Sequence, residues 1–415
     1  MHSMKRTSIA AFALAFVPVL LAQSGWVATW SASPSPQLAA QADMQSAKMI
    51  FQNQTFRQIV HTSIGGSTAR VRISNVFNAS PLQVDGVHIA LRNGAAANIV
   101  AASDQALTFS GRSSVSIPPG TVMISDPIPF AVPADGDLVI SFYFSALTWG
   151  AGIHYSSLQT NYIGNGDQTQ SATFSSTTTV ASWAFLAGVD VQVPNGGGTI
   201  VTFGDSITDG TNSTAGADHR WPNFLARNLL AAGMTNIAVA DAGISGNRIL
   251  HDGIQPTDVK FGVNGLQRFE RDVIAVPGVK WVIILLGIND IGQPGSSSAP
   301  VSETVSADDI IAAYKQMTDR AHEMGIKVIG CTITPFAVYT SAGWYTPDKD
   351  AERNQVNDWI RNANYFDSYA DLDIVLRDPN NGSQLLPIFD SGDHLHPNDA
   401  GYQMIGSLFS LTLFQ

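Results

Sequence analysis

The sequence has one cysteine in 415 residues, and charged residues make up only 13% of it. Cys331 has no partner for a disulfide within the chain, so the fold has to be stabilised by its hydrophobic core. Cys331 lies in the apolar stretch Lys327–Ile333, where a lone thiol is typical of a small buried hydrophobic side chain. The sequence therefore gives no sign of a redox role.

Positive charge is also scarce. Lysine and arginine together number 22, against 33 aspartates and glutamates, which gives a formal net charge of −11. The balance argues against nucleic acid or an anionic membrane surface as a partner, because both bind through clusters of basic side chains.

Long apolar runs are missing after the first 22 residues. At the start, Lys5 and Arg6 precede an apolar stretch that continues to Ala22, which is typical of a secretory signal peptide over residues 1–22. No later run is long enough to span a bilayer, so no integral membrane segment is expected in the mature chain. We therefore expect a secreted or periplasmic protein.

Several catalytic motifs are absent as well. No Gly-x-Ser-x-Gly elbow, phosphate-binding loop or Gly-x-Gly-x-x-Gly fingerprint follows a predicted strand. These absences argue against an elbow-type lipase, a kinase and a dehydrogenase. No cofactor is expected, and we find no internal repeat.

The length and the hydrophobic pattern predict two domains. Residues 23–194 show short alternating stretches such as Leu138–Phe144, broken by Gly, Pro, Asn and Asp, which predicts an antiparallel β-sandwich. The stretch Gln37–Phe51 is ambiguous between helix and strand. Three glycines in Asn195–Gly198 predict a flexible junction, after which residues 198–415 form the second domain.

In this second domain the spacing of apolar residues changes, and it predicts strands and helices in alternation. The predicted strands cover residues 199–202, 237–239, 281–286, 327–333 and 372–376, and the predicted helices cover 222–232, 307–324, 351–362 and a segment after 398. This alternation predicts a doubly wound parallel sheet in a three-layer α/β/α arrangement. The helix that follows Ser306 is expected to bury a stripe of side chains ending at Met324.

Three residues have the chemistry of an acyl-transfer site. Ser206 follows the first predicted strand of the second domain, and Asp393 and His396 lie three residues apart near the chain end. A serine, an imidazole and a carboxylate can act as nucleophile, base and orienting group. Loops at the carboxyl ends of parallel strands meet at one rim, so these residues can converge.

Four sequence blocks resemble the SGNH (GDSL) hydrolases. They are Gly204-Asp205-Ser206, Gly246 in Ile244–Asn247, Asn289 in Gly287–Asp290, and Asp393-x-x-His396. The resemblance covers residue 198 to the end, and one departure is Ile207 in place of leucine. It implies a flavodoxin-like fold and ester hydrolysis by Ser206, His396 and Asp393. It also implies an oxyanion hole from the N–H groups of Ser206 and Gly246 and the amide of Asn289.

Neighbouring polar residues leave alternatives open. His394 is a rival base, although only His396 has the family spacing, and Asp205 and Asp209 are expected to shape the nucleophile loop. Asp290 is expected to be a solvated neighbour. A metal site is the main chemical alternative, formed by Asp390, Asp393, His394 and His396.

The substrate is the least determined feature. Resemblance to secreted members with an added β-domain implies acetyl esters of polysaccharides, with a GDSL-type lipase or lysophospholipase as the alternative. A hypothesis of another class is carbohydrate binding by the β-domain. The candidate stacking faces for it are Trp149, Tyr155, Tyr162 and Trp183. A purely structural β-domain packed against the catalytic rim is the default interpretation.

Overall fold

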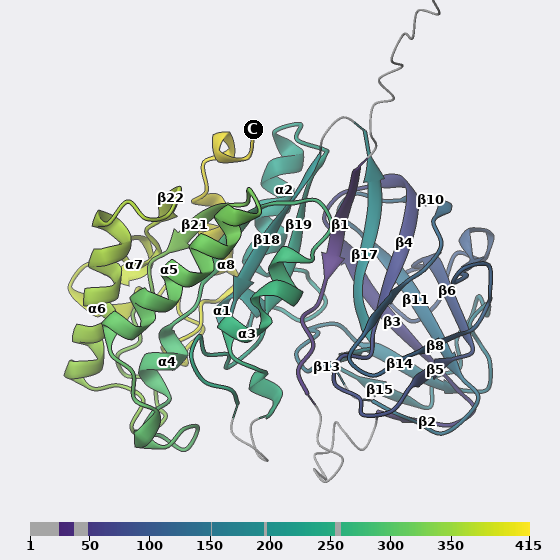
Figure 1. Cartoon of the computed structure of the whole chain (residues 1–415), viewed down its shortest axis with the longest axis horizontal. Helices are drawn as coiled ribbons and strands as arrows, with labels where there is room; N and C mark the ends of the chain where they lie inside the picture. The colour runs from purple at the N-terminus through teal and green to yellow at the C-terminus, as the bar shows by residue number, and fades with distance from the viewer. Residues whose placement is uncertain (1–24, 37–48, 151, 195–196, 254–258) are drawn as a thin grey trace, which may run out of the picture.

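The computed structural model describes residues 25–36, 49–150, 152–194, 197–253 and 259–415. The predicted signal peptide, most of the ambiguous stretch and residues 195–196 of the predicted junction lie outside these ranges. Figure 1 shows a sheet covered by helices beside a body made of strands. Among the described residues, no helix combines the length and the apolar composition that crossing a membrane requires.

The N-terminal half consists of two stacked antiparallel sheets. The first has the order β1 (Gly25–Ser31), β17 (Leu186–Val193), β4 (Gly66–Ser74), β10 (Ile128–Val132), with β9 (Val122–Ile124) also on β4. The second has the order β15 (Thr178–Val180), β14 (Asn161–Asn165), β3 (Gln54–Thr62), β11 (Gly136–Phe144), β6 (Gly86–Leu91), β7 (Gln105–Ala106). Three small pairs join β2 (Ile50–Phe51) to β12 (Thr148–Trp149), β13 (Ile153–His154) to β16 (Trp183–Ala184), and β5 (Leu82–Val84) to β8 (Val115–Ile117).

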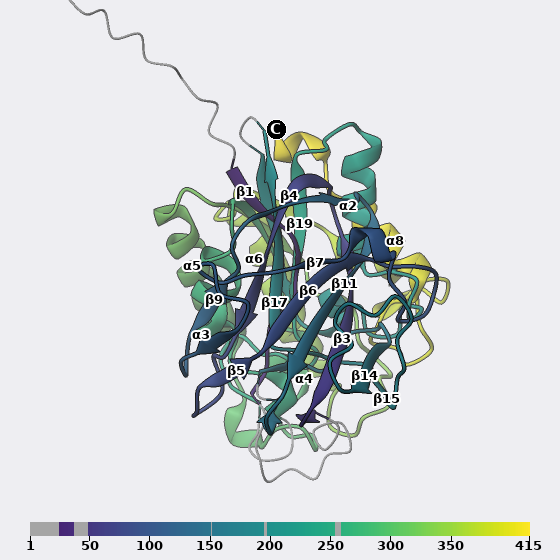
Figure 2. The ribbon, with the colours of Figure 1, turned by 90° about the vertical axis from the view of Figure 1, so that its right-hand side faces the viewer.

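The alternation in β11 shows why these strands stack. Leu138, Ile140 and Phe142 point into the core between the sheets, whereas Val139 belongs to a separate small cluster on the opposite face. Successive side chains of a strand point to opposite faces, so every second residue of β11 lies in the core between the sheets, as the sequence predicts. Figure 2 shows β3, β11 and β6 side by side in the sheet nearest the viewer. The expectation of an antiparallel β-sandwich is confirmed.

The C-terminal half is built on a parallel sheet. Its order is β19 (Ile237–Gly243), β18 (Gly198–Gly204), β20 (Val279–Leu285), β21 (Lys327–Cys331), β22 (Ser368–Ala370). All four pairings are parallel. The first strand, β18, thus lies between the second and the third. In open α/β sheets ligands bind at this reversal of strand order, outside the carboxyl ends of the strands.

Helices cover both faces of this sheet. One face carries α2 (Trp221–Ala231), α7 (Leu372–Leu376) and α8 (Asp399–Ser407), and the other carries α3 (Gly265–Phe269), α4 (Ile288–Gly292), α5 (Ala307–Glu323) and α6 (Pro347–Asn362). Along β18, Ile200 packs on the first face, and Val201 and Phe203 pack on the second. The doubly wound, three-layer fold is confirmed.

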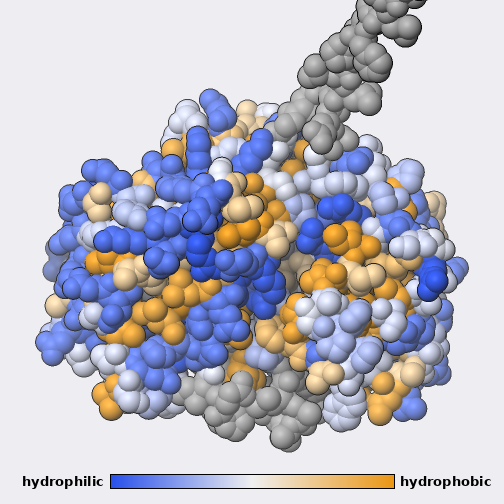
Figure 3. Space-filling view, in the orientation of Figure 1, coloured by the Kyte–Doolittle hydropathy of each residue, from blue (hydrophilic) through white to orange (hydrophobic). Residues whose placement is uncertain are grey.

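Shorter elements complete the two halves. They are α1 (Ser206–Asp209), β23 (Arg377–Asp378), β24 (Asn381–Leu385), a π-helical turn at Glu270–Ile274, and 3₁₀ turns at Ala101–Ser103, Val259–Phe261, Val301–Glu303 and Leu411–Phe414, the first of them in the sandwich. Over the helix-covered half, Figure 3 shows a mainly hydrophilic surface with separate hydrophobic patches.

Two details of the predicted fold are wrong. The segment Leu372–Leu376 is a helix and not a strand, because Asp371 caps it and buried Leu372 and Leu376 stand one helical turn apart. The last strand of the parallel sheet is instead β22. Met324 is 62% exposed because the helix ends before it. Cys331 is buried in the core, as expected.

The sandwich lies against the open edge of the parallel sheet. Strand β1 packs beside β19, and the Ser31 hydroxyl donates to the Asp241 carbonyl at 2.7 Å. The backbone N–H of Val239 donates to the Ser63 hydroxyl at 3.1 Å, and that of Ala28 donates to the Thr199 hydroxyl at 3.0 Å. An unpaired sheet edge is a site of aggregation, and the sandwich covers this one.

Candidate active site

Ser206 is the first residue of α1, directly after β18. Asp205 is the N-cap of this short helix, and its side chain accepts the Ile207 N–H at 3.0 Å. Burial raises the pKa of Asp205 to about 7. The cap fixes the sharp turn that ends the strand, which confirms the expected role of Asp205. Ser206 therefore stands at the carboxyl end of β18, an inner strand of the parallel sheet.

Ser206, His396 and Asp393 form one line of hydrogen bonds. The Oγ atom of Ser206 lies 2.8 Å from Nε2 of His396, and Nδ1 of His396 lies 2.6 Å from Oδ2 of Asp393. A carboxylate only accepts, so Nδ1 carries the proton and Nε2 of a neutral ring accepts from the serine. The structure thus brings the three predicted residues together in the order that acyl transfer requires.

Asp393 is held as an anion. Its Oδ1 atom accepts the backbone N–H groups of Leu395 at 2.9 Å and His396 at 2.8 Å, and Asn212 donates to Oδ2 at 2.9 Å. Burial alone would raise the pKa of Asp393, but the hydrogen bond and charge of His396 and the backbone donors outweigh it and hold the pKa well below its usual range. Asn212 was not predicted, since no motif marks it.

Gly246 follows β19 with a φ of +79°. A Cβ atom at this position would collide with the Phe261 ring, so both backbone and space require glycine. Its carbonyl accepts from Nε2 of Gln293 at 2.8 Å. The same Nε2 donates to Oδ1 of Asn289 at 3.0 Å, and Nδ2 of Asn289 donates to the Asn247 carbonyl at 3.1 Å. Gly246 and Asn289 are thus tied together.

Two residues that hold these loops were missed. Gln293 follows Asn289 by four residues, and this helical spacing is a signal that could have revealed it. Arg268 is fully buried and donates to the carbonyls of Gly204 and Ala242, each at 2.8 Å, and to Oδ1 of Asn247 at 2.8 Å. It therefore joins the ends of β18 and β19, and nothing in its sequence context marks this role.

The prediction that Asp290 is a solvated neighbour of the site is wrong. Asp290 is 2% exposed, and its carboxylate accepts the backbone N–H of Ile249 at 2.8 Å and that of Leu250 at 3.1 Å. Burial raises its pKa to about 6. The loop after β19 folds over α4 and encloses this carboxylate, which turns it into an anchor for the loop.

The rival base His394 has a different partner. Its Nδ1 lies 2.6 Å from Oδ2 of Asp390, whereas His396 is the histidine that reaches Ser206. The four residues of the alternative metal site thus divide into two His–Asp pairs. Within the described ranges, the grouping with metal-ligand spacing is His61, Asp137 and Asp218, at the domain boundary. Both ring nitrogens of His61 already lie against carboxylates, at 2.8 and 2.9 Å.

The aromatic residues proposed as stacking faces differ in exposure. Trp183 is 4% exposed, and its indole N–H donates to the Ile59 carbonyl at 2.8 Å, so this part of the prediction is wrong. Its place in a core pair with Trp30 explains the burial. Trp149 is 49% exposed. Tyr155 and Tyr162 line a cavity of 460 Å³ at the domain boundary.

Comparison with known proteins places this site in a family. The model of the GDSL-like Lipase/Acylhydrolase family matches residues 202–404. No curated protein sequence gives a significant match.

Similar solved structures include a GDSL-like lipase from Bacteroides thetaiotaomicron, with 21% identity over 51% of this chain and 84% of that chain and a TM-score of 0.37. The aryl esterase of M. smegmatis has 21% identity over 50% of this chain and 94% of that chain, with a TM-score of 0.38. A carbohydrate acetylesterase from Sinorhizobium meliloti has 17% identity over 50% of this chain and 94% of that chain, with a TM-score of 0.38. Residues 202–404 therefore form a domain of the GDSL-like lipase/acylhydrolase family, which supports ester hydrolysis as the activity of this domain.

Proposed function

We propose that the protein is a serine esterase that hydrolyses short-chain carboxylic esters, acetyl esters of polysaccharides in particular, after export from the cell. The observation that carries the proposal is the line of hydrogen bonds from Ser206 through His396 to Asp393. Signal-peptide composition at residues 1–22 supports export.

The geometry supports a two-step reaction. His396 takes the proton of Ser206 as Oγ bonds to the ester carbonyl carbon, and the imidazolium then gives that proton to the departing alcohol. Asp393 stabilises the imidazolium through Nδ1. In the second step water attacks the acyl-enzyme, and His396 takes its proton and returns it to Ser206. The products are a carboxylic acid and an alcohol, and no cofactor enters the balance.

The oxyanion of each tetrahedral intermediate needs donors. We assign them to the backbone N–H groups of Ser206 and Gly246 and to the amide of Asn289, which has a second hydrogen beyond the one given to Asn247. Gln293 supports this assignment because its donation to Oδ1 of Asn289 fixes which end of the amide carries the hydrogens.

Two cavities support a polysaccharide as the alcohol part of the substrate. One, of 340 Å³, adjoins Ser245 and Thr211 beside Gly246 and has both polar and aromatic side chains in its lining. The other, of 460 Å³, shares Tyr155 with it and continues to Tyr162. Hydroxyl-rich ligands suit polar walls with aromatic faces, and two successive cavities suit a polymer.

Acetyl esters are expected to react faster than esters with chains of roughly eight or more carbons. Each buried methylene contributes only about 0.8 kcal/mol, and only where an apolar channel receives it. The test is kcat/KM for a series of 4-nitrophenyl esters from acetyl to decanoyl, measured below the micelle concentration of each ester. Faster cleavage of the decanoyl ester would refute the short-chain proposal and favour the lipase or lysophospholipase alternative.

Treatment with EDTA is expected to leave kcat unchanged, because the proposed reaction uses only side chains and water. The measurement is acetyl ester hydrolysis after dialysis against EDTA and after readdition of Zn²⁺. Activity that disappears in EDTA and returns with Zn²⁺ would favour a metal site at the two His–Asp pairs of residues 390–396.

A further inference from the structure

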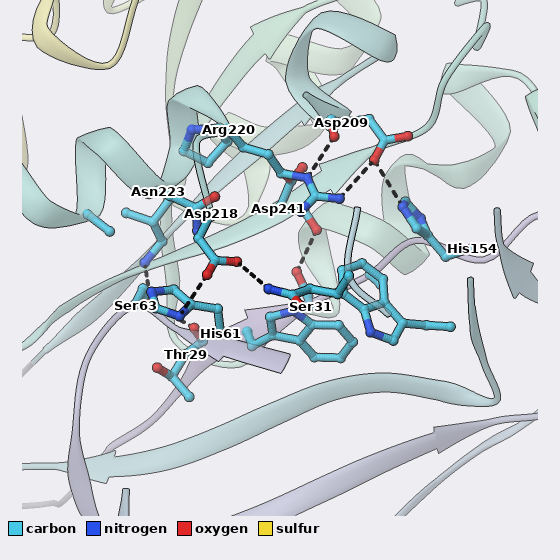
Figure 4. A pocket seen from close by; sticks show the side chains of 17 residues that line it. Thr29, Ser31, His61, Ser63, His154, Asp209, Asp218, Arg220, Asn223 and Asp241 are labelled. Atoms are coloured by element: carbon cyan, nitrogen blue, oxygen red, sulfur yellow. Dashed lines mark hydrogen bonds and ion pairs between the residues drawn. The ribbon is translucent and has the colours of Figure 1, made fainter. Parts of the chain in front are cut away.

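His154 of the sandwich contacts the catalytic half next to the proposed nucleophile. It lies in β13, and its Nε2 atom is 3.0 Å from Oδ1 of Asp209, the last residue of α1. Its Nδ1 atom is 3.0 Å from the carbonyl oxygen of Ser33. Figure 4 shows His154 pointing from its own domain toward Asp209.

The partners of His154 determine its charge. A backbone carbonyl and a carboxylate both only accept hydrogen bonds, so both ring nitrogens carry protons and the ring is an imidazolium. The side chains of His154 and Asp209 are 8% and 2% exposed. Burial alone would lower the pKa of His154, but the charge of Asp209 and its hydrogen bond outweigh burial and raise it. The pair is therefore a buried ion pair between the two domains.

The other oxygen of Asp209 leads to the proposed oxyanion hole. Oδ2 of Asp209 accepts both the backbone N–H of Ser245 at 3.1 Å and its hydroxyl at 2.7 Å. Ser245 directly precedes Gly246. Asp209 itself stands three residues after Ser206, so one carboxylate links the nucleophile helix, the oxyanion loop and the sandwich.

We propose that His154 is a positioning residue of the active site, which holds Asp209 and through it the loop Ser245–Gly246, so that the sandwich forms part of the catalytic machinery. This inference rests on the proposed function. It assigns the sandwich a role in the rate of ester hydrolysis that is distinct from binding carbohydrate.

Other charged groups face the same pair. Arg220 donates through Nε to the Asp209 carbonyl at 2.6 Å, its Nη2 lies 3.7 Å from Oδ1 of Asp209, and its Nε lies 3.7 Å from the Asp241 carboxylate. Burial raises the pKa of Asp241 to about 7. Lys260 lines the cavity that His154 also lines. The uncharged Trp183 ring lies beside the imidazole, tilted by 38°, with the ring centroids 5.3 Å apart.

The sign of the pH effect follows from the imidazolium. As pH rises through the raised pKa of His154, the ring loses one N–H and faces either Asp209 or the Ser33 carbonyl with a lone pair. The link then loosens, so kcat is expected to fall on the alkaline side. Asp241 titrates in both the wild type and a His154 variant, so comparing the two proteins at each pH isolates His154.

The test is His154→Gln, assayed for kcat and KM on 4-nitrophenyl acetate from pH 6 to 10. Misplacing a catalytic group by 1 Å can cost about 100-fold, so we expect kcat to fall roughly 10- to 100-fold with KM nearly unchanged, and the alkaline decline of the wild type to disappear. The matched control is His88→Gln. His88 is another buried sandwich histidine, paired with Asp104 at 3.0 Å, and its replacement should leave kcat and the pH profile unchanged.

A purely structural role gives a different result. If His154→Gln lowers the melting temperature but keeps the wild-type kcat and alkaline decline, the inference is wrong. If that variant does not fold, Ser245→Ala tests the same link from the catalytic side, and an unchanged kcat overturns the inference. Failure of the proposed function is distinguishable, because it would appear as a wild type without esterase activity or a fully active Ser206→Ala.

Discussion

Replacing Ser206 by alanine is expected to lower kcat for acetyl ester hydrolysis by roughly 10⁶-fold, the loss seen when the nucleophile of a serine hydrolase is removed. The hydroxyl bonds the substrate carbon, and no other group in the chain is assigned that role. The fold should persist, since the change removes one hydrogen bond to His396, which contributes about 1 kcal/mol. Initial rates on 4-nitrophenyl acetate, together with a thermal melt by circular dichroism, measure both effects.

The matched control for this experiment is Ser213→Ala. Ser213 is a buried serine in the loop that follows α1, and among the described residues its hydroxyl has no hydrogen-bond partner. The control variant should keep wild-type kcat. Near-wild-type activity in Ser206→Ala would remove the central claim about the nucleophile.

Asp393→Asn is expected to lower kcat by about 10⁴-fold, as replacement of the triad carboxylate does in other serine hydrolases. An asparagine amide donates toward Nδ1 of His396, which forces the proton onto Nε2 and leaves no lone pair for Ser206. The loss should appear in kcat more than in KM. Single-turnover kinetics with an excess of enzyme measures the acylation step directly.

Asp390→Asn provides the comparison, because Asp390 lies in the same loop and pairs with His394 through a similar contact. It should reduce kcat far less than Asp393→Asn. A larger loss of kcat in Asp390→Asn than in Asp393→Asn would mean that His394, and not His396, is the base.

Ser206, Gly246 and Asn289 could be located from sequence, because each lies in a short block after a predicted strand, and their convergence follows from parallel topology. Asp393 and His396 could be located only from their family spacing, because the strand predicted before them is the helix α7. Asp290 could not be interpreted correctly in this way, since its burial depends on how the loop at Ile249 and Leu250 folds over it. A local pattern carries no information on that packing.

The link between His154 and Asp209 was beyond sequence reasoning for a related reason. The two residues belong to different domains, and the docking of β1 against β19 that brings them together is set by side-chain packing and scattered hydrogen bonds. No period or motif encodes such a contact. The error at Leu372–Leu376 is different, because a five-residue apolar segment suits a short helix as well as a strand.

The pairing of β1 with β17 has a kinetic consequence. Gly25 at the start of the sandwich lies opposite Val193 at its end, so this strand pair closes a loop that contains the entire sandwich. Contacts between such distant residues form slowly, because loop-closure entropy has to be overcome first. Ser33, whose carbonyl accepts from the ring of His154, lies two residues after β1. Full esterase activity should therefore appear during refolding only after the slowest strand pairing of the neighbouring domain, even where the parallel sheet has formed earlier.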